Sequence, residues 1–109
     1  MPPVSQIMPA EVLRLEALIT PTEQGIASRV LAKTPGGNVT LFAFDGGQGL
    51  TQHTSPFEAL VLVLSGSLDL TIGTTIVKAT PGTIVRMPGN VPHAVDALEP
   101  TRMLLVMLR

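Results

Sequence analysis

The sequence contains no cysteine, tryptophan or tyrosine, and it has only three phenylalanines. The absence of cysteine excludes disulfides, thiolate metal sites and cysteine nucleophiles, and it is typical of a cytoplasmic protein. Because aromatic residues are so few, the core is expected to be aliphatic. Charged residues make up only 14% of the chain and the formal net charge is −1. Without a basic cluster, the charge pattern predicts no nucleic-acid partner.

Long hydrophobic runs are absent as well. The longest, Ala59–Leu64 and Met103–Leu108, have six residues each, whereas a helix needs about 20 apolar residues to cross a bilayer. Met1–Ala10 has no positive charge and no long apolar segment, so it does not predict a signal peptide. We therefore expect no membrane partner and a cytoplasmic location.

The 109 residues include ten glycines and ten prolines, and 45% of the chain is hydrophobic. This length predicts one domain, and frequent turn residues favour short strands over long helices. Val39–Asp45 and Ser67–Ile72 alternate as strands do, with Ser67 expected to face outward, while Phe57–Leu64 is almost continuously apolar, as in a strand covered on both faces. Further strands are expected at Ile26–Thr34, Thr75–Lys78, Thr83–Met87, Val91–Asp96 and Thr101–Leu108. The pattern predicts an all-β sandwich, barrel or jelly roll.

Residues 1–25 are expected to form an arm that packs on the β-domain or exchanges with a second copy. Within the arm, Glu11–Ile19 fits both a helical and a strand periodicity, and Pro21 ends it in either case.

Two segments resemble the paired motifs of the cupin superfamily. In the first motif, five residues separate Gly47 from His53, and Gly66 closes the motif at the matching distance. Ser55 stands where the family has its second histidine, and Ala59 stands where the family has a glutamate.

In the second motif, Gly82, Pro88 and His93 match the family pattern. Asn90 replaces a glycine, and both residues tolerate a positive φ. His53 and His93 are the only histidines of the chain. The chain is identified by this resemblance as a small single-domain cupin of the type-2, RmlC-like kind. The resemblance implies a cupin double-stranded β-helix, a jelly-roll barrel, over residues 26–109 with a short N-terminal arm.

The resemblance also implies where a site would lie. Cupins hold a divalent metal, such as Mn, Fe, Ni, Cu or Zn, with three imidazoles and one carboxylate at the barrel mouth. Here His53 and His93 are the candidate metal ligands of an incomplete set. Positions 53, 55 and 59 are expected to point inward together, because side chains two apart on one strand share a face. The candidate ligand-pocket residues are His53, Ser55, Ala59, Arg86, Met87 and His93, with a solvated Arg86 and a core-filling Met87 as the alternatives.

Three functions stay open. The first is binding of a small molecule near the two histidines, and the second is a metal-dependent reaction, dioxygenase- or isomerase-like, at a partial site. The third is a structural or regulatory homodimer. Cupin epimerases resemble a histidine base acting with a tyrosine acid, and the chain has no tyrosine. A homodimer is expected because Phe57–Leu64 and Met103–Leu108 offer apolar side chains on both strand faces.

Overall fold

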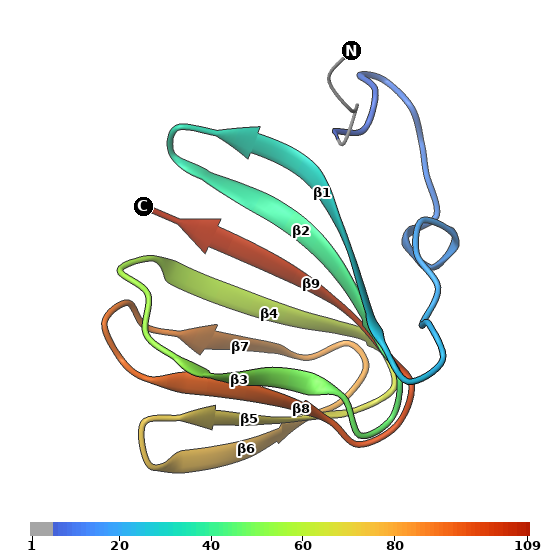
Figure 1. Cartoon of the computed structure of the whole chain (residues 1–109). Helices are drawn as coiled ribbons and strands as arrows, with labels where there is room; N and C mark the ends of the chain where they lie inside the picture. The colour runs from blue at the N-terminus through green and yellow to red at the C-terminus, as the bar shows by residue number, and fades with distance from the viewer. Residues whose placement is uncertain (1–5) are drawn as a thin grey trace.

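The structure, a computed structural model, describes residues 6–109, and these residues form an all-β domain (Figure 1). Two antiparallel sheets face each other, as a jelly roll requires. The five-stranded sheet has the order β1 (Ile26–Thr34), β2 (Gly37–Phe44), β9 (Thr101–Leu108), β4 (Glu58–Ser65) and β7 (Ile84–Met87). The four-stranded sheet has the order β3 (Gly49–His53), β8 (His93–Ala97), β5 (Leu68–Ile72) and β6 (Thr75–Ala79). The expected all-β fold is confirmed. Within residues 6–109, no helix is long and apolar enough to cross a membrane.

The main core lies between the two sheets and follows the two-residue period of the strands. On β4, Val61 and Val63 are buried, whereas Leu60 and Leu62 on the other face are only half-buried. The expected cover on both faces of this strand is therefore only partial on the face that carries Leu60 and Leu62. The core is aliphatic apart from Phe44, which is fully buried.

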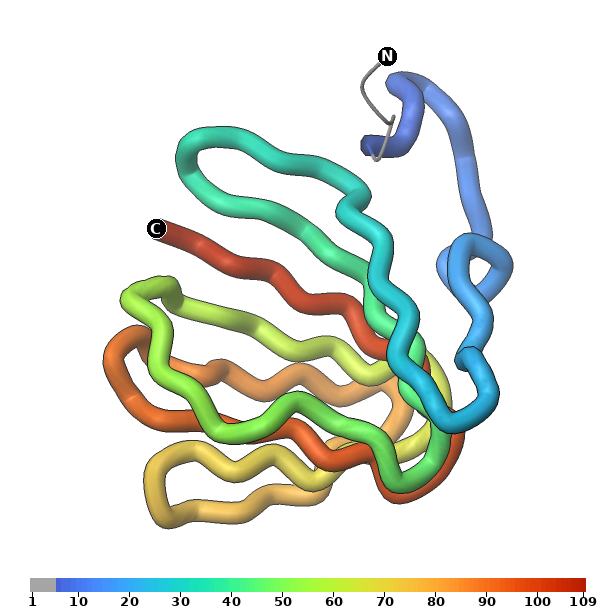
Figure 2. Tube along the Cα trace, in the orientation of Figure 1, coloured from blue at the N-terminus to red at the C-terminus, as the bar shows by residue number. Residues whose placement is uncertain are grey.

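A second apolar cluster lies on the outer face of the five-stranded sheet, under the arm. Figure 2 shows the arm running beside β1. Ile19 packs there against Leu41 and Ala43, and the guanidinium of Arg102 donates a hydrogen bond to the carbonyl of Ile19 at 2.9 Å. These contacts attach the arm to the sheet. Its exchange with a second copy stays a prediction, and the part of the expected arm at residues 1–5 lies outside the described residues.

The arm is neither the helix nor the strand that the sequence allowed over Glu11–Ile19. Its only regular element among the described residues is η1 (Leu15–Ala17), a three-residue 3-10 helix. Its N-cap residue Arg14 supplies no side-chain hydrogen bond to the helix. An uncapped turn of this length has little stability of its own, so packing on the sheet fixes the arm instead.

Ser67 departs from the expected alternation. It was expected to face outward, but it is buried just before β5. Its backbone N–H donates to Thr101 Oγ1 and its hydroxyl donates to Glu99 Oε2, both at 3.1 Å. These polar partners make its burial possible.

Candidate functional site

The two histidines lie opposite each other on neighbouring strands. His53 ends β3, His93 begins β8, and the two are register partners. The ladder is irregular between Leu50 and His53, because Leu50 pairs with Val95, only two residues beyond His93. A regular strand would place residues three apart on opposite faces, whereas this bulge lets Leu50 and His53 both face inward.

The imidazole rings of His53 and His93 meet through their Nε2 atoms, which are 3.1 Å apart. The ring centroids are 4.3 Å apart and the ring planes are inclined by 71°. Each Nδ1 faces a backbone carbonyl, that of Thr51 at 2.9 Å for His53 and that of Val91 at 3.1 Å for His93. A carbonyl only accepts, so each Nδ1 carries a hydrogen and a neutral ring has a bare Nε2.

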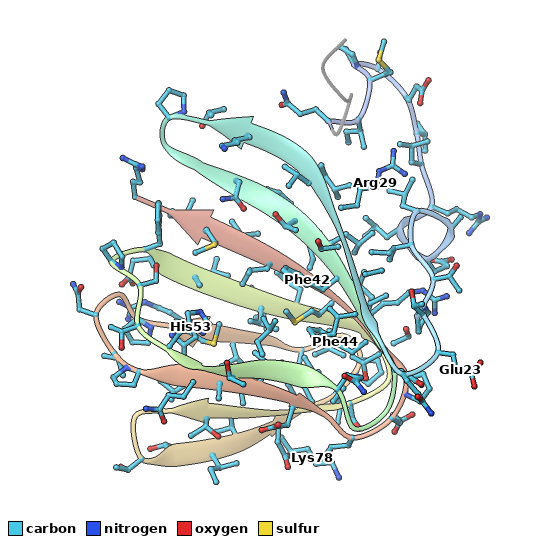
Figure 3. All side chains as sticks on the ribbon, in the orientation of Figure 1. Glu23, Arg29, Phe42, Phe44, His53 and Lys78 are labelled. Carbon is cyan, nitrogen blue, oxygen red and sulfur yellow. The ribbon has the colours of Figure 1, made fainter. Side chains whose placement is uncertain are left out.

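The facing Nε2 atoms of His53 and His93 decide what this pair can bind. Two bare nitrogens cannot hydrogen-bond to each other, so the arrangement calls for a proton, a ligand donor or a metal ion next to both. His93 is buried at 4% exposure, whereas His53 is exposed. Figure 3 shows His53 near the edge of the barrel where several loops meet, with Phe42 and Phe44 deeper between the sheets. The pair therefore connects solvent with the barrel interior.

A cavity of about 270 Å³ extends from the histidines into the barrel. Ten of the residues that the structure describes line it, and the two histidines are the only polar side chains among these ten. Ala59 and Met87, both expected at the pocket, line it together with His53 and His93. Met103 and Met107 were not expected at the pocket, although both lie on the inward face of β9 and line the cavity. The alternation of β9 was the signal that could have found them.

Ser55 does not line this cavity. β3 ends at His53 and Ala59 belongs to β4, so the expectation that positions 53, 55 and 59 share one strand is wrong. Ser55 lies in the connecting loop, where its Oγ accepts a hydrogen bond from the N–H of Phe57 at 3.1 Å. Its carbonyl accepts one from the N–H of Asn90 at 2.7 Å, and Asn90 has the expected positive φ of 64°. Ser55 thus joins the loops that precede β4 and β8.

Arg86 also lies outside the cavity. It precedes Met87 on β7, and adjacent strand residues point to opposite faces. Its Nε donates to Glu58 Oε1 at 2.7 Å, and its side chain is 65% exposed. Glu58 Oε2 also accepts a hydrogen bond from the N–H of Gly89 at 2.6 Å. The Gly89 hydrogen bond, followed by the Arg86 interaction, lowers the pKa of Glu58 below its ordinary value of 4.5.

The divalent-metal cage of the cupin pattern does not fit these residues. Two imidazoles converge, but Ala59 offers no ligand atom and Ser55 lies in a loop outside the cavity. Glu58 neighbours Ala59 but is engaged with Arg86 and Gly89. Among residues 6–109, no three or more His, Cys, Asp or Glu side chains gather in a metal-binding group. These residues therefore do not form the divalent-metal cage of the family pattern.

A larger groove, of about 470 Å³, lies at the surface beside the β1–β2 turn. Lys33, Phe57 and Arg109 are among its lining residues, and it shares no residue with the barrel cavity. The Arg109 guanidinium lies 5.2 Å from the centre of the Phe57 ring. The groove is open to solvent, whereas the barrel cavity is more enclosed and contains the converging histidines, so the barrel cavity is the candidate site.

Comparisons with known proteins agree with this architecture. Residues 40–108 match the family described as Cupin domain. A conserved protein of unknown function from Streptococcus pyogenes is 33% identical, with a TM-score of 0.91 over 100% of this chain and 96% of that one. A cupin superfamily protein from Desulfitobacterium hafniense is 23% identical, with a TM-score of 0.87 over 95% of this chain and 94% of that one.

A cupin 2 conserved barrel domain protein from Leptotrichia buccalis is 30% identical, with a TM-score of 0.82 over 85% of this chain and 45% of that one. No curated protein matches the sequence. The family match covers more than half of the chain, including both histidines, and the described fold is that of its structural relatives. The chain therefore belongs to the cupin family.

Proposed function

We propose that this protein binds a small, mainly apolar molecule with a hydroxyl group inside the barrel. One observation supports the proposal above all others: eight apolar side chains and two histidines line the cavity, and the histidines meet at its polar end. Transfer of apolar ligand surface from water into such a cavity is favourable by about 25 cal/mol per Å².

The polar end favours a ligand that donates a hydrogen bond. Because the Nδ1 atoms of His53 and His93 are directed at backbone carbonyls, their Nε2 atoms are the ones left for a ligand. A neutral imidazole Nε2 accepts, so an alcohol or a phenol is a suitable partner. Among residues 6–109, no aspartate, glutamate, lysine or arginine side chain lines the cavity. A charged ligand would lose its hydration without a full counter-charge, which is costly.

The size of the cavity limits the ligand further. Its volume of about 270 Å³ is slightly below the range of roughly 300–1,000 Å³ for pockets that hold drug-sized ligands. The ligand is therefore expected to be no larger than a single substituted ring or a short branched chain.

A comparison of phenol, toluene and benzoate tests the proposal. We expect calorimetry to show tighter binding of phenol than of toluene by roughly 2- to 10-fold, the value of one hydrogen bond. Benzoate is expected to bind more weakly than phenol.

His53→Ala is expected to remove the preference for phenol, while Gln52→Ala, a change at the exposed neighbour on β3, keeps it. Equal binding of phenol and toluene by the parent protein would refute the assigned polar end, and no binding of either would refute the proposal.

We also propose that two copies pair through the outer face of the five-stranded sheet. Apolar side chains form two cross-strand rows there: Val39–Val106–Leu60 and Leu41–Leu104–Leu62–Ile84. The arm covers Leu41, while Leu60, Leu62 and Val106 are only half-buried and Ile84 is 57% exposed. A continuous apolar surface of this kind favours association, and a symmetric dimer would bury it from both copies at once.

A further inference from the structure

Methionine side chains are concentrated around the barrel cavity. Of the five methionines in the sequence, Met87, Met103 and Met107 line this cavity. Met87 and Met103 are buried, and Met107 is half-buried. Ten of the described residues line the cavity, and methionine is the commonest residue type among them. The three methionines are therefore candidates for contacts with a ligand.

The three methionines belong to one wall of the cavity, the five-stranded sheet. Ala59 on β4 is the register partner of Met87 on β7 and of Met107 on β9. Met103, which lies earlier on β9, is the register partner of Phe42 on β2, and Phe42 also lines the cavity. The two histidines belong to β3 and β8 of the facing four-stranded sheet. A ligand in the cavity therefore lies between a wall with three thioethers and a wall that carries the imidazoles.

Ala59 separates Met87 from Met107 in this ladder. The strands β7 and β9 flank β4, and neighbouring strands lie about 4.7–4.9 Å apart, so β7 and β9 are roughly 9–10 Å apart. The side chain of Ala59 ends at Cβ and leaves space between the two longer side chains. A flat ring over Ala59 would lie about 5 Å from the strand of each methionine, and a thioether sulfur in contact with an aromatic ring lies at a similar distance from it.

We infer that the hydroxyl-bearing ligand of the cavity is aromatic, a phenol rather than an aliphatic alcohol, and that its ring lies over Ala59 between Met87 and Met107. The inference rests on the proposed function, which leaves open whether the apolar part of the ligand is aromatic. A polarizable thioether makes favourable contacts with the edge of an aromatic ring, and the rotatable bonds of methionine let its sulfur adjust to that ring. An aliphatic ring of similar size lacks these contacts. The methionines therefore favour phenol over its saturated analogue cyclohexanol.

The ring contacts and the hydroxyl contact fall within one enclosed space. Ala59, Met87 and Met107 line the same cavity of about 270 Å³ as the histidine pair. Met87 ends β7 and His93 begins β8 after a short loop, so the two residues lie at the same end of the barrel. A phenol over Ala59 is thus enclosed together with the two imidazoles, whose Nε2 atoms accept a hydroxyl hydrogen.

Simpler effects compete with this inference. The hydroxyl of phenol is a stronger hydrogen-bond donor than that of cyclohexanol, and Phe42 offers its own ring for aromatic contact. Met87 and Met107 can also be core-filling side chains with no effect on ligand choice, since methionine packs readily into irregular apolar space. None of these effects depends on sulfur. A change in the preference for phenol when sulfur is removed therefore separates the inference from all of them.

The test measures binding of phenol and of cyclohexanol to the full-length protein by calorimetry. We expect the parent to bind phenol more tightly than cyclohexanol. Met87→Leu combined with Met107→Leu is expected to reduce this preference by about 2- to 10-fold, the value of one thioether–aromatic contact. Leucine nearly preserves the volume of methionine, so the fold is expected to be kept. Met8→Leu, at an exposed position of the arm, is the matched control and is expected to keep the preference of the parent.

Nuclear magnetic resonance of the parent protein with isotope-labelled methionine methyl groups tests the position of the ring directly. The ring current of bound phenol is expected to shift the methyl signals of Met87 and Met107, whereas the signal of the exposed Met8 is expected to stay in place. Cyclohexanol has no ring current and is expected to shift the same signals less.

Three results would each overturn the inference: equal binding of phenol and cyclohexanol by the parent, an unchanged preference in the double variant, or methyl signals of Met87 and Met107 that respond to phenol no more than that of Met8. In each case phenol still binds, so the proposed function stands. If neither phenol nor cyclohexanol binds, the proposed function fails and the inference fails with it.

Discussion

The carboxylate of Glu58 accepts a hydrogen bond from the backbone N–H of Gly89, with 2.6 Å between Oε2 and N, across 31 residues of sequence. Glu58 begins β4, and Gly89 lies in the turn that leads to His93. The backbones are also close here, because a Cβ on Gly89 would lie 2.7 Å from the carbonyl oxygen of Pro56. The contact therefore fixes the loop before β8 against the loop before β4.

Glu58→Gln is expected to lower the melting temperature at pH 7. The folded protein holds the pKa of Glu58 below 4.5 through the Gly89 and Arg86 hydrogen bonds. A lowered folded-state pKa stabilises the fold above the unfolded-state pKa, and this stabilisation is lost as the pH falls through the folded-state value. The difference between parent and variant is therefore expected to shrink as the pH falls below about 4.5.

Melting curves between pH 3 and pH 7 measure this difference. Glu16→Gln is the control, because Glu16 lies on the exposed arm and its nearest cation, Arg14, is 4.0 Å away. We expect it to change the melting temperature little at any pH, as most exposed substitutions do. A Glu58→Gln variant as stable as the parent at pH 7 would contradict the stabilising role.

Two motif glycines with the same backbone conformation differ in the space around them. Gly66 has φ 84° and Gly82 has φ 83°, so alanine at either position is strained. No atom of the described part of the chain lies within 4 Å of a Cβ at Gly82, whereas a Cβ at Gly66 would overlap Thr101 Oγ1 and the carbonyl of Pro100. Gly82→Ala is expected to cost about 1–2 kcal/mol for the left-handed conformation. Gly66→Ala is expected to cost a further ~1–3 kcal/mol for the overlap. Denaturant unfolding measures both, and equal losses would argue against close packing at Gly66.

The sequence predicted strands where turn residues and alternation agreed. The bounds of β1 and β9 are as expected, because glycine and proline residues follow or precede clear apolar patterns. β3 was missed, because Gly46, Gly47 and Gly49 suggest a loop. The structure explains one of them: a Cβ on Gly49 would overlap the carbonyl of Val95, so glycine permits the close contact between β3 and β8. Sequence spacing gives no indication of such contacts.

The site was predictable only in part, because the chain around His53 does not form one regular strand. His53, His93, Ala59 and Met87 could be placed together from the motif resemblance, and they line one cavity. Ser55 could not be placed correctly, because the rule that side chains two apart share a face holds only along one unbroken strand. A bulge between Leu50 and His53 and a loop after His53 both break that rule. Met87 and Met107 lie beside Ala59 because β4 pairs with β7 and β9. The sequence does not specify this pairing.

If two copies pair through the five-stranded sheet, an isoleucine-to-lysine substitution has different effects on the two sheets. Ile84→Lys introduces a charge into the apolar rows of the five-stranded sheet, whereas Ile76→Lys changes β6 of the four-stranded sheet, where Ile76 is 67% exposed. Light scattering of the parent protein at micromolar concentration is expected to give twice the chain mass of 11.5 kDa. Ile84→Lys is expected to shift the mass toward one chain, and Ile76→Lys to leave it unchanged. A parent protein of 11.5 kDa would refute the dimer, and dissociation by Ile76→Lys alone would assign the interface to the other sheet.

Ala59→Glu is expected to give the cavity affinity for a divalent metal ion. The side chain of Ala59 is 2% exposed and faces the cavity between Met87 and Met107. A glutamate there would place a carboxylate near the two imidazoles and supply the hard ligand that the parent site lacks. Without metal, burial of this polar group is expected to cost about 1–3 kcal/mol. The variant is therefore expected to melt below the parent.

Divalent metal is expected to reverse that loss in the variant only. Zn(II) or Mn(II) at about 100 times its dissociation constant stabilises a folded site by about 2.7 kcal/mol, which corresponds to a rise in melting temperature of roughly 10–20 °C for a domain of this size. The parent, which has no carboxylate in the cavity, is expected to show a much smaller rise with the same ions. His93→Ala in the Ala59→Glu background removes one imidazole and is expected to abolish the rise, because a carboxylate and one exposed histidine hold a divalent ion weakly. A folded Ala59→Glu variant that melts at the same temperature with and without either ion would show that position 59 and the histidine pair do not converge on one point.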